Sequence, residues 1–148
     1  MTDFSQIKIL PFSEKYLLDV LKIERMSFSK PWTREMFERE LSLPISRFFV
    51  LVFDAQITGY AGYWLVGEDA HLLNMAVHPE FRRKGFGKTI LEFIVLKARE
   101  EGARSMLLEV RKKNLNARAL YSSMGFKEVG VRPRYYGDDD AVLMDKTL

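Results

Sequence analysis

Residues 82–88 bring two glycines and four basic side chains together, in the order Arg82-Arg83-Lys84-Gly85-Phe86-Gly87-Lys88. Glycine lets the backbone approach an anion closely, and the first amides of a helix carry partial positive charge. Because an apolar helical pattern follows directly, this segment suits the binding of a phosphate or pyrophosphate group. The alternative for this segment taken by itself is a basic, solvated helix start without a ligand.

Two common phosphate-binding motifs do not fit this segment. Gly87-Lys88-Thr89 resembles the end of a Walker A loop, but that motif requires a glycine where this chain has Arg82. A Rossmann turn requires a third glycine where this chain has Ile90. What remains is an Arg-x-x-Gly-x-Gly turn that opens an amphipathic helix.

Glu109 lies inside the apolar run 106–110, which we predict to be a strand. Partial burial in that strand would raise the pKa of Glu109 and suit it to general-base chemistry. The alternatives are that Glu109 faces solvent at a strand end or forms a salt bridge.

The chain has 148 residues, of which 47% are hydrophobic and 29% charged. These values are typical of a globular protein, and we expect a single domain over residues 1–148. The absence of cysteine excludes a disulfide framework and a cysteine nucleophile, and with two histidines we expect no metal site. The net charge of +3 fits an anionic small ligand as well as a nucleic acid. Since we find no signal-peptide pattern and no apolar run approaching about 18 residues, we expect a cytoplasmic protein without membrane contact.

The elements that must position these residues alternate along the chain. We predict strands at 7–10, 47–53, 57–66, 70–77, 105–110, 126–131 and 141–146, and helices after Ser13, from Thr33 to Leu41, at 89–101 and after Asn114. In the second helix, Met36, Phe37 and Leu41 are expected on the inner side. Short turns make the three middle strands antiparallel, whereas the unit 70–110 should be a right-handed parallel crossover. The fold class is therefore α/β, with a mixed, mostly antiparallel sheet and helices on both faces.

Several segments together resemble the GNAT N-acetyltransferases. The turn at 82–87 follows Asn74-Met75-Ala76-Val77-His78-Pro79, as in the acyl-CoA motif of that family. Other segments resemble its RimI branch, whose members acetylate protein N-termini, including that of a ribosomal protein. These segments are Leu108–Arg111, Asn114, Ala119–Phe126, Arg134–Tyr136, Asp140–Met144 and the early helix break Pro31-Trp32-Thr33. The resemblance covers nearly the whole chain and is more specific in the second half.

This resemblance implies a binding site for acetyl-CoA. The pyrophosphate would lie on the backbone amides of the glycine turn, formed by Arg83, Lys84, Gly85, Phe86, Gly87 and Lys88. The pantetheine arm would pair with Met75, Ala76 and Val77 as an added strand, and an amide near Val77 would polarise the thioester carbonyl. Asn114 matches a cofactor-contacting position, although it is equally suited to be a helix N-cap.

The resemblance also implies catalytic roles. Glu109 matches the general base and Tyr121 the general acid that protonates the departing sulfur, although Tyr121 alone reads as a core tyrosine. Trp32, Tyr135 and Tyr136 are candidates for the wall that binds the peptide, although aromatic residues more often belong to the core. The chain departs from many bacterial members because only residues 137–139 separate the paired tyrosines from Asp140. The preferred first residue of the substrate is therefore not implied.

The implied function is transfer of an acetyl group from acetyl-CoA to the N-terminal α-amine of a protein, with a ribosomal protein as a candidate substrate. An alternative within the family is acetylation of a small amine or a lysine side chain. A third hypothesis is nucleic-acid binding through the basic segments 82–84 and 111–113. The mild net charge and the acidic run Asp138–Asp140 argue against it, so we expect no direct nucleic-acid partner.

Overall fold

The computed structural model describes residues 3–148, which are built around a mixed sheet with the strand order β1-β2-β3-β4-β5-β7-β6. The strands are β1 (Ile7–Pro11), β2 (Ser46–Phe53), β3 (Gln56–Val66), β4 (Asp69–Val77), β5 (Ser105–Arg111), β6 (Lys127–Arg132) and β7 (Ala141–Thr147). In the described sheet β4 and β5 pair in parallel, and the other neighbours pair antiparallel. The predicted mixed sheet with its parallel crossover is confirmed.

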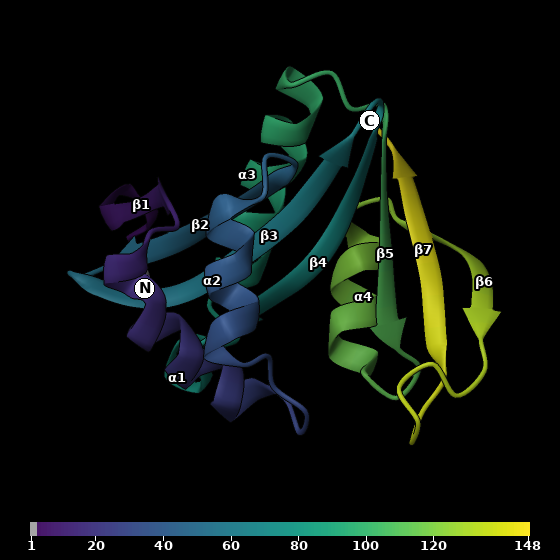
Figure 1. Cartoon of the computed structure of the whole chain (residues 1–148), viewed down its shortest axis with the longest axis horizontal. Coiled ribbons are helices and arrows are strands. Elements are labelled where there is room, and N and C mark those ends of the chain that lie inside the picture. The colour runs from purple at the N-terminus through teal and green to yellow at the C-terminus, as the bar shows by residue number, and fades with distance from the viewer. Residues whose placement is uncertain (1–2) are drawn as a thin grey trace.

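Helices cover both faces of this sheet, as predicted (Figure 1). They are α1 (Leu17–Ser27), α2 (Arg34–Ser42), α3 (Phe86–Glu100) and α4 (Leu115–Ser123), with short 3-10 turns at Phe4–Gln6, Glu14–Tyr16 and Pro79–Phe81. In Figure 1, α1 and α2 lie in front of the sheet and α3 lies behind it. Within residues 3–148, no helix is long and apolar enough to cross a membrane.

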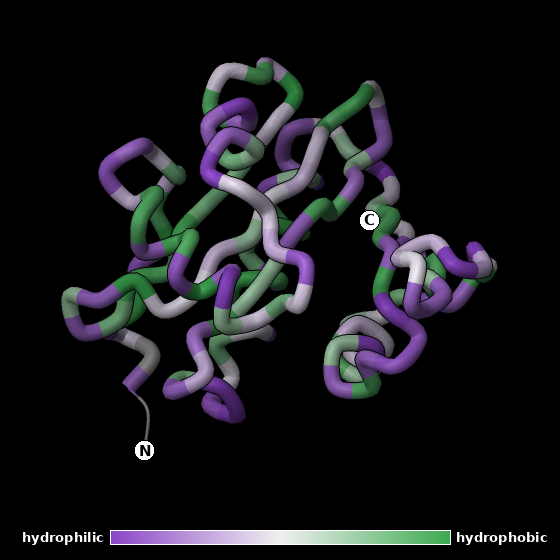
Figure 2. The backbone as a smooth tube through the Cα atoms, turned by 60° about the horizontal axis from the view of Figure 1, so that its bottom comes forward, coloured by the Kyte–Doolittle hydropathy of each residue, from purple (hydrophilic) through white to green (hydrophobic). Residues whose placement is uncertain are grey.

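Two apolar clusters hold the helices on the sheet. On the α3 side, Ile90, Leu91, Ile94 and Ala98 recur at helical spacing, and each is fully buried against the strands. On the α1 and α2 side, the ring of Phe37 contacts that of Tyr60 edge to face, with centroids 5.9 Å apart. In Figure 2, hydrophobic stretches of the backbone (green) run through the middle of the molecule, and many of the outer turns are hydrophilic (purple).

Two details of the helices differ from the prediction. Met36 and Leu41 are exposed, and Glu40 is buried in their place because it accepts hydrogen bonds from Trp64 Nε1 at 2.6 Å and Ser46 Oγ at 3.1 Å. Helix α3 begins at Phe86, not at residue 89, so that the end of the glycine turn is already helical. The inward position of Phe37 is confirmed.

Strands β4 and β5 pair over only one end and then diverge, as Figure 1 shows. Their parallel register joins residues 69–72 to residues 105–108. A bulge follows in β4, because Tyr63 of β3 pairs with Leu72 whereas the adjacent Gly62 pairs with Asn74, which leaves Leu73 as an extra residue. The opening between residues 73–77 of β4 and residues 109–111 of β5 is called the wedge below.

Candidate active site

The wedge exposes one backbone edge of β4. Residues 74–77 pair with β3 on one side, but the described β4–β5 register ends at Leu72 on the other. Arg82 fixes the far end of this edge, since its Nε donates to Val77 O at 2.9 Å and its Nη2 to Ser27 Oγ at 3.0 Å. An unpaired strand edge of this kind can accept an extended ligand as a further strand.

The glycine turn follows at the end of that edge and has the conformation that an anion site needs. Gly85 is the N-cap of α3 with a φ of 85°, and Arg83 also has a positive φ, of 62°. Thr89 N–H donates to Gly85 O at 3.0 Å, so the amides of the first helical turn point out of the helix end. A side chain at residue 87 would begin 3.4 Å from Leu120 Cδ2 of α4 and 3.8 Å from Val77 Cγ2. Helix α3, helix α4 and β4 thus converge closely at Gly87.

The other residues of the turn contribute unequally. The Phe86 ring is buried and lies 5.1 Å from that of Phe53, so only its backbone can face a ligand. Lys84 Nζ lies 5.6 Å from the centre of the Phe81 ring, whereas Lys88 forms an exposed pair with Glu92 at 3.9 Å. These two lysines can supply positive charge at the surface of the turn.

Asn114 is the N-cap of α4, as one of its two predicted roles required. Its side-chain Oδ1 accepts a hydrogen bond from Ala117 N–H at 3.1 Å. The cap starts α4 about two turns before Tyr121 and thereby helps to set the position of that tyrosine.

Glu109 forms a close contact with a histidine that the sequence prediction did not include. Its Oε2 lies 2.6 Å from His71 Nε2, and the Glu109 and His71 side chains are 11% and 34% exposed. Both point away from α3, because Ala70 and Leu108, their neighbours along β4 and β5, belong to the core on the α3 side. His71 pairs with Leu107 in the parallel register, which brings it beside Glu109.

The pKa of Glu109 is lowered, so the prediction of a raised pKa is wrong. The hydrogen bond from His71 lowers the pKa more than burial raises it, and the nearby charge of Arg132 adds to the lowering. Glu109 is therefore an ionised carboxylate at neutral pH. It is paired with His71, which corresponds to the salt-bridge alternative given in the sequence prediction. The signal in the sequence was a histidine within an apolar strand, but the register that joins it to Glu109 is not visible there.

Tyr121 lies on the opposite face of the sheet from Glu109. It belongs to the core on the α3 side and packs edge to face on Phe126, with ring centroids 5.8 Å apart. Burial raises the pKa of Tyr121, and the proximity of Tyr136 raises it further. Tyr121 is therefore a protonated hydroxyl at neutral pH. The candidate base Glu109 and the candidate acid Tyr121 lie beside the wedge on opposite faces of the sheet.

The paired tyrosines lie in the loop between β6 and β7. The Arg111 guanidinium lies 4.4 Å from the centre of the Tyr136 ring, and burial together with the charge of Glu109 raises the pKa of Tyr136 to about 12. The Tyr135 ring meets that of Tyr136 edge to face at 5.0 Å and is half exposed. Lys30 Nζ, from the loop between α1 and α2, donates to Tyr136 O at 3.2 Å. The loops from the two halves of the sheet therefore meet.

Trp32 occupies a different environment from these tyrosines. Its ring lies 5.0 Å from that of Phe37 and 5.8 Å from that of Phe48, in the core on the α1 side. Its backbone N–H donates to Glu24 Oε2 at 2.8 Å. Trp32 is thus half-buried, and its contacts hold the loop between α1 and α2 rather than form an open wall.

Glu24 is a second functional candidate, which the sequence prediction did not single out. It is 1% exposed and accepts hydrogen bonds from Trp32 N–H, from Asn74 Nδ2 at 2.8 Å and from the Tyr60 hydroxyl. It therefore ties the loop between α1 and α2 to β3 and to the start of the β4 edge. A carboxylate on an apolar helical face was the available signal.

The acidic run in the same C-terminal loop is occupied by contacts within the protein. Asp138 pairs with Arg111 at 2.6 Å, Asp139 accepts from Lys113 N–H at 3.0 Å, and Asp140 accepts from Arg134 N–H at 2.8 Å. These carboxylates shape the loop that carries the tyrosines.

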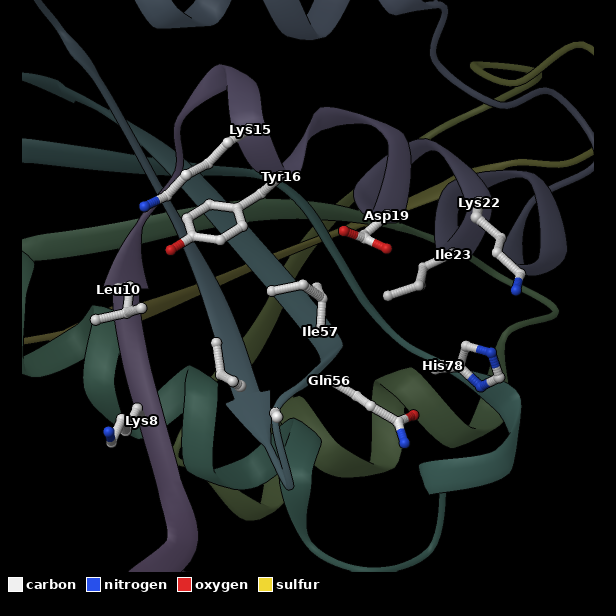
Figure 3. A pocket seen from close by; sticks show the side chains of 12 residues that line it. Lys8, Leu10, Lys15, Tyr16, Asp19, Lys22, Ile23, Gln56, Ile57 and His78 are labelled. Carbon is white, nitrogen blue, oxygen red and sulfur yellow. The ribbon is translucent and has the colours of Figure 1, made fainter.

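A cavity of about 580 Å³ lies elsewhere, between β1, α1 and the β2–β3 turn (Figure 3). Its lining includes Lys8, Lys15, Lys22, Asp19 and His78 around an apolar floor. In Figure 3, Lys15 and Lys22 lie on opposite sides of this cavity. Neither Glu109 nor Tyr121 lines it, so the cavity is separate from the wedge.

Comparison with known proteins agrees with this geometry. The sequence model of the acetyltransferase (GNAT) family matches residues 17–126. A relative from Bacillus subtilis is 38% identical over 132 residues, which cover 87% of each chain. The crystal structure of the ribosomal-protein-S18-alanine N-acetyltransferase from Escherichia coli superposes with a TM-score of 0.89 at 30% identity, covering 95% of this chain and 93% of that one. A GNAT acetyltransferase from Elizabethkingia anophelis, solved with acetyl-CoA bound, shares the fold at a TM-score of 0.80 and 18% identity, covering 97% of this chain and 99% of that one. The chain therefore belongs to the acetyltransferase (GNAT) family, in its RimI-like branch.

Proposed function

We propose that this protein transfers the acetyl group of acetyl-CoA to the N-terminal α-amine of a protein, and that its substrate is a ribosomal protein. Support comes from family membership and from the activity named for the Escherichia coli relative. We further propose that residues 1–148 act as one domain in the cytoplasm. The proposed reaction requires neither nucleic acid nor a membrane.

The wedge, whose free β4 edge ends at the glycine turn, is the observation that carries the proposal. Met75, Ala76 and Val77 would bind the pantetheine arm through their backbone, with Gly59 and its neighbours pairing on their other side. The amides of residues 83–88 would bind the pyrophosphate at the α3 N-terminus, and Asn114 would contact the cofactor while it caps α4. Acetyl-CoA supplies the activated acetyl group when bound, and the residues present fit it because the edge and the turn are continuous.

Glu109 and Tyr121 would perform the proton transfers. The ionised carboxylate of Glu109 supplies the negative charge that favours loss of a proton from the amine. The protonated hydroxyl of Tyr121 donates its proton to the departing sulfur. An α-amine, with an ordinary pKa of about 8, is partly neutral at physiological pH, so a carboxylate-based site suits it better than it suits a lysine side chain.

Tyr135 and Tyr136 would form the wall that receives the peptide. They lie at the junction with the loop between α1 and α2, where Lys30 contacts Tyr136. Trp32 would contribute to the wall only through the loop between α1 and α2, because its ring packs into the core. Tyr136 also lies close enough to Glu109 for the carboxylate to raise its pKa, which supports a position beside the reacting amine.

The test measures the release of free CoA thiol from acetyl-CoA, with and without short peptides that vary in their first residue. Mass spectrometry then locates the acetyl group. A matched peptide with a blocked N-terminus and an internal lysine separates the alternatives, because only side-chain acetylation survives the block. Absence of N-terminal acetylation across the panel and on ribosomal proteins would contradict the proposal, and activity on lysine or on a small amine would favour the alternative.

A further inference from the structure

We propose that His71 is a catalytic residue that accepts the proton of the substrate amine at Nδ1, while Glu109 holds the imidazole through Nε2. The inference rests on the proposed function and deepens it, because it divides the basic role between two residues. Glu109 becomes the group that orients the imidazole and stabilises its charged form. The arrangement parallels the carboxylate and histidine of a serine-protease triad, on an unrelated site.

The contact geometry fixes which atoms are available. An ionised carboxylate accepts hydrogen bonds and cannot donate them, so the 2.6 Å contact with Glu109 Oε2 places a proton on His71 Nε2. In the neutral imidazole, Nδ1 then carries the lone pair. His71 is also three times as exposed as Glu109, at 34% against 11% of the side chain, so the imidazole is the more accessible of the two groups.

The chemistry also favours the imidazole over the carboxylate. The same hydrogen bond lowers the pKa of Glu109, which makes its carboxylate a weaker proton acceptor than an ordinary glutamate. Imidazoles ordinarily titrate near pH 6.5, closer to an α-amine at about 8 than carboxylates do. A proton acceptor is most effective when its pKa lies near the operating pH.

The surroundings leave Glu109 as the charged partner of His71. Arg132 on β6 acts on Glu109 from the far side, and Tyr136 is protonated at neutral pH. On the same face of the sheet as His71, Glu24 of α1 is bonded to Asn74, Tyr60 and Trp32. Glu40 of α2 is bonded to Ser46 and to Trp64, the cross-strand neighbour of His71.

The resulting step balances. The amine nitrogen forms a bond to the acetyl carbon, and one of its protons passes to His71 Nδ1. The carbon–sulfur bond breaks, and the sulfur takes the proton of the Tyr121 hydroxyl. The imidazolium then returns its proton through solvent to the tyrosinate, which restores both residues.

The test compares His71→Ala and His71→Gln with the wild type, using an acceptor amine that the wild type acetylates. We expect kcat/KM to fall by about 10²- to 10⁴-fold in both variants, and the acidic limb of its pH profile to change, because only the titration of the substrate amine then remains. Added imidazole should restore part of the activity of His71→Ala, after subtraction of the rate without enzyme. The affinity for CoA should stay within about twofold of the wild type. His78→Asn is the matched control, because asparagine can still accept the bond that His78 Nδ1 receives from Glu80 N–H, and its pH profile should not change.

Two outcomes would overturn the inference. One is near-normal activity of both His71 variants, and the other is reduced activity with an unchanged pH profile and no rescue by imidazole, which is the result of a structural role. Failure of the proposed function is a separate result, because it concerns which amine the wild type accepts. If that amine is a lysine or a small molecule, the His71 comparison remains decisive with that substrate.

Discussion

Glu109 shows how a contact that is distant in sequence changes the chemistry of a residue. An apolar strand around a carboxylate predicted burial and a raised pKa. The structure buries the carboxylate, but the bond from His71, 38 positions away in the chain, lowers the pKa instead. Residue type and neighbourhood identified the candidate, whereas its protonation state depends on a partner that only the sheet register supplies.

Replacing Glu109 with glutamine separates charge from shape. Glu109→Gln keeps an acceptor oxygen for His71 but removes the negative charge that stabilises the protonated form of the basic group. We expect kcat to fall by about 10²-fold or more, with the dissociation constant of acetyl-CoA nearly unchanged, as measured by steady-state kinetics and calorimetry. Unchanged turnover would remove Glu109 from the mechanism.

Tyr121 can be tested in the same way because its ring and its hydroxyl have different roles. Tyr121→Phe keeps the packing on Phe126 and removes the proton that the sulfur would receive. We expect a fall in kcat of about 10²-fold or more with little change in melting temperature. If turnover stays normal, Tyr121 is a core tyrosine, which is the other reading of its position on an amphipathic helix.

The elements were more predictable than their junctions. The order of strands and helices, the parallel crossover and the Asn114 cap follow from local patterns of apolar residues, turns and capping residues. The bulge at Leu73 and the end of β4–β5 pairing do not, because strand register depends on partners elsewhere in the chain. The buried Glu40 in place of Leu41 has the same origin, since its partner Trp64 lies in another element.

The glycine turn depends on close packing at Gly87. Gly87→Val would press its branched side chain on Leu120 and Val77 and occupy the space in front of the helix amides. We expect at least about a tenfold loss of CoA affinity, equivalent to about 1.4 kcal/mol, in a calorimetric titration. Gly87→Ala, whose single added carbon lies in ordinary contact distance of Leu120, should lose clearly less. Equal, wild-type affinity in both variants would remove the turn from the binding site.

The loop between α1 and α2 depends on the buried carboxylate of Glu24. Glu24→Gln replaces an acceptor of three hydrogen bonds with an amide that can satisfy fewer donors. We expect the free energy of unfolding in urea to fall by about 1–3 kcal/mol. Glu38→Gln on α2 is the matched control, since its pair with Arg34 is exposed and such pairs contribute about 0–1 kcal/mol. Equal stability of the two variants would show that the Glu24 network does not hold the loop.

At the scale of the whole molecule, the wedge divides the sheet into two parts. Strands β1–β4 and strands β5–β7 share four residue pairs between β4 and β5, and the loops meet again where Lys30 contacts Tyr136. Each part contributes to the proposed site, with the cofactor edge from β4 and Glu109 from β5. In the proposed site, binding and catalysis would therefore both require the two parts to keep their relative position.

A ligand that occupies the wedge should stabilise the fold. At a CoA concentration of about 100 times its dissociation constant, the stabilisation is about 2.7 kcal/mol, which corresponds to a rise in melting temperature of roughly 5–10 °C. Differential scanning fluorimetry with and without CoA measures this shift. Gly87→Val should show a smaller rise at the same CoA concentration, and a wild-type protein whose melting temperature does not change with CoA would contradict binding in the wedge.

The junction of β4 and β5 is short, because only four residue pairs join the two parts of the sheet there. A protease cleaves a chain of this kind mainly when it opens, and the opened fraction falls as the ligand concentration rises. We therefore expect the half-life of the protein to shorten when nutrients that feed acetyl-CoA synthesis are withdrawn. Through that opening, the amount of enzyme would follow the supply of its own cosubstrate without a dedicated regulator.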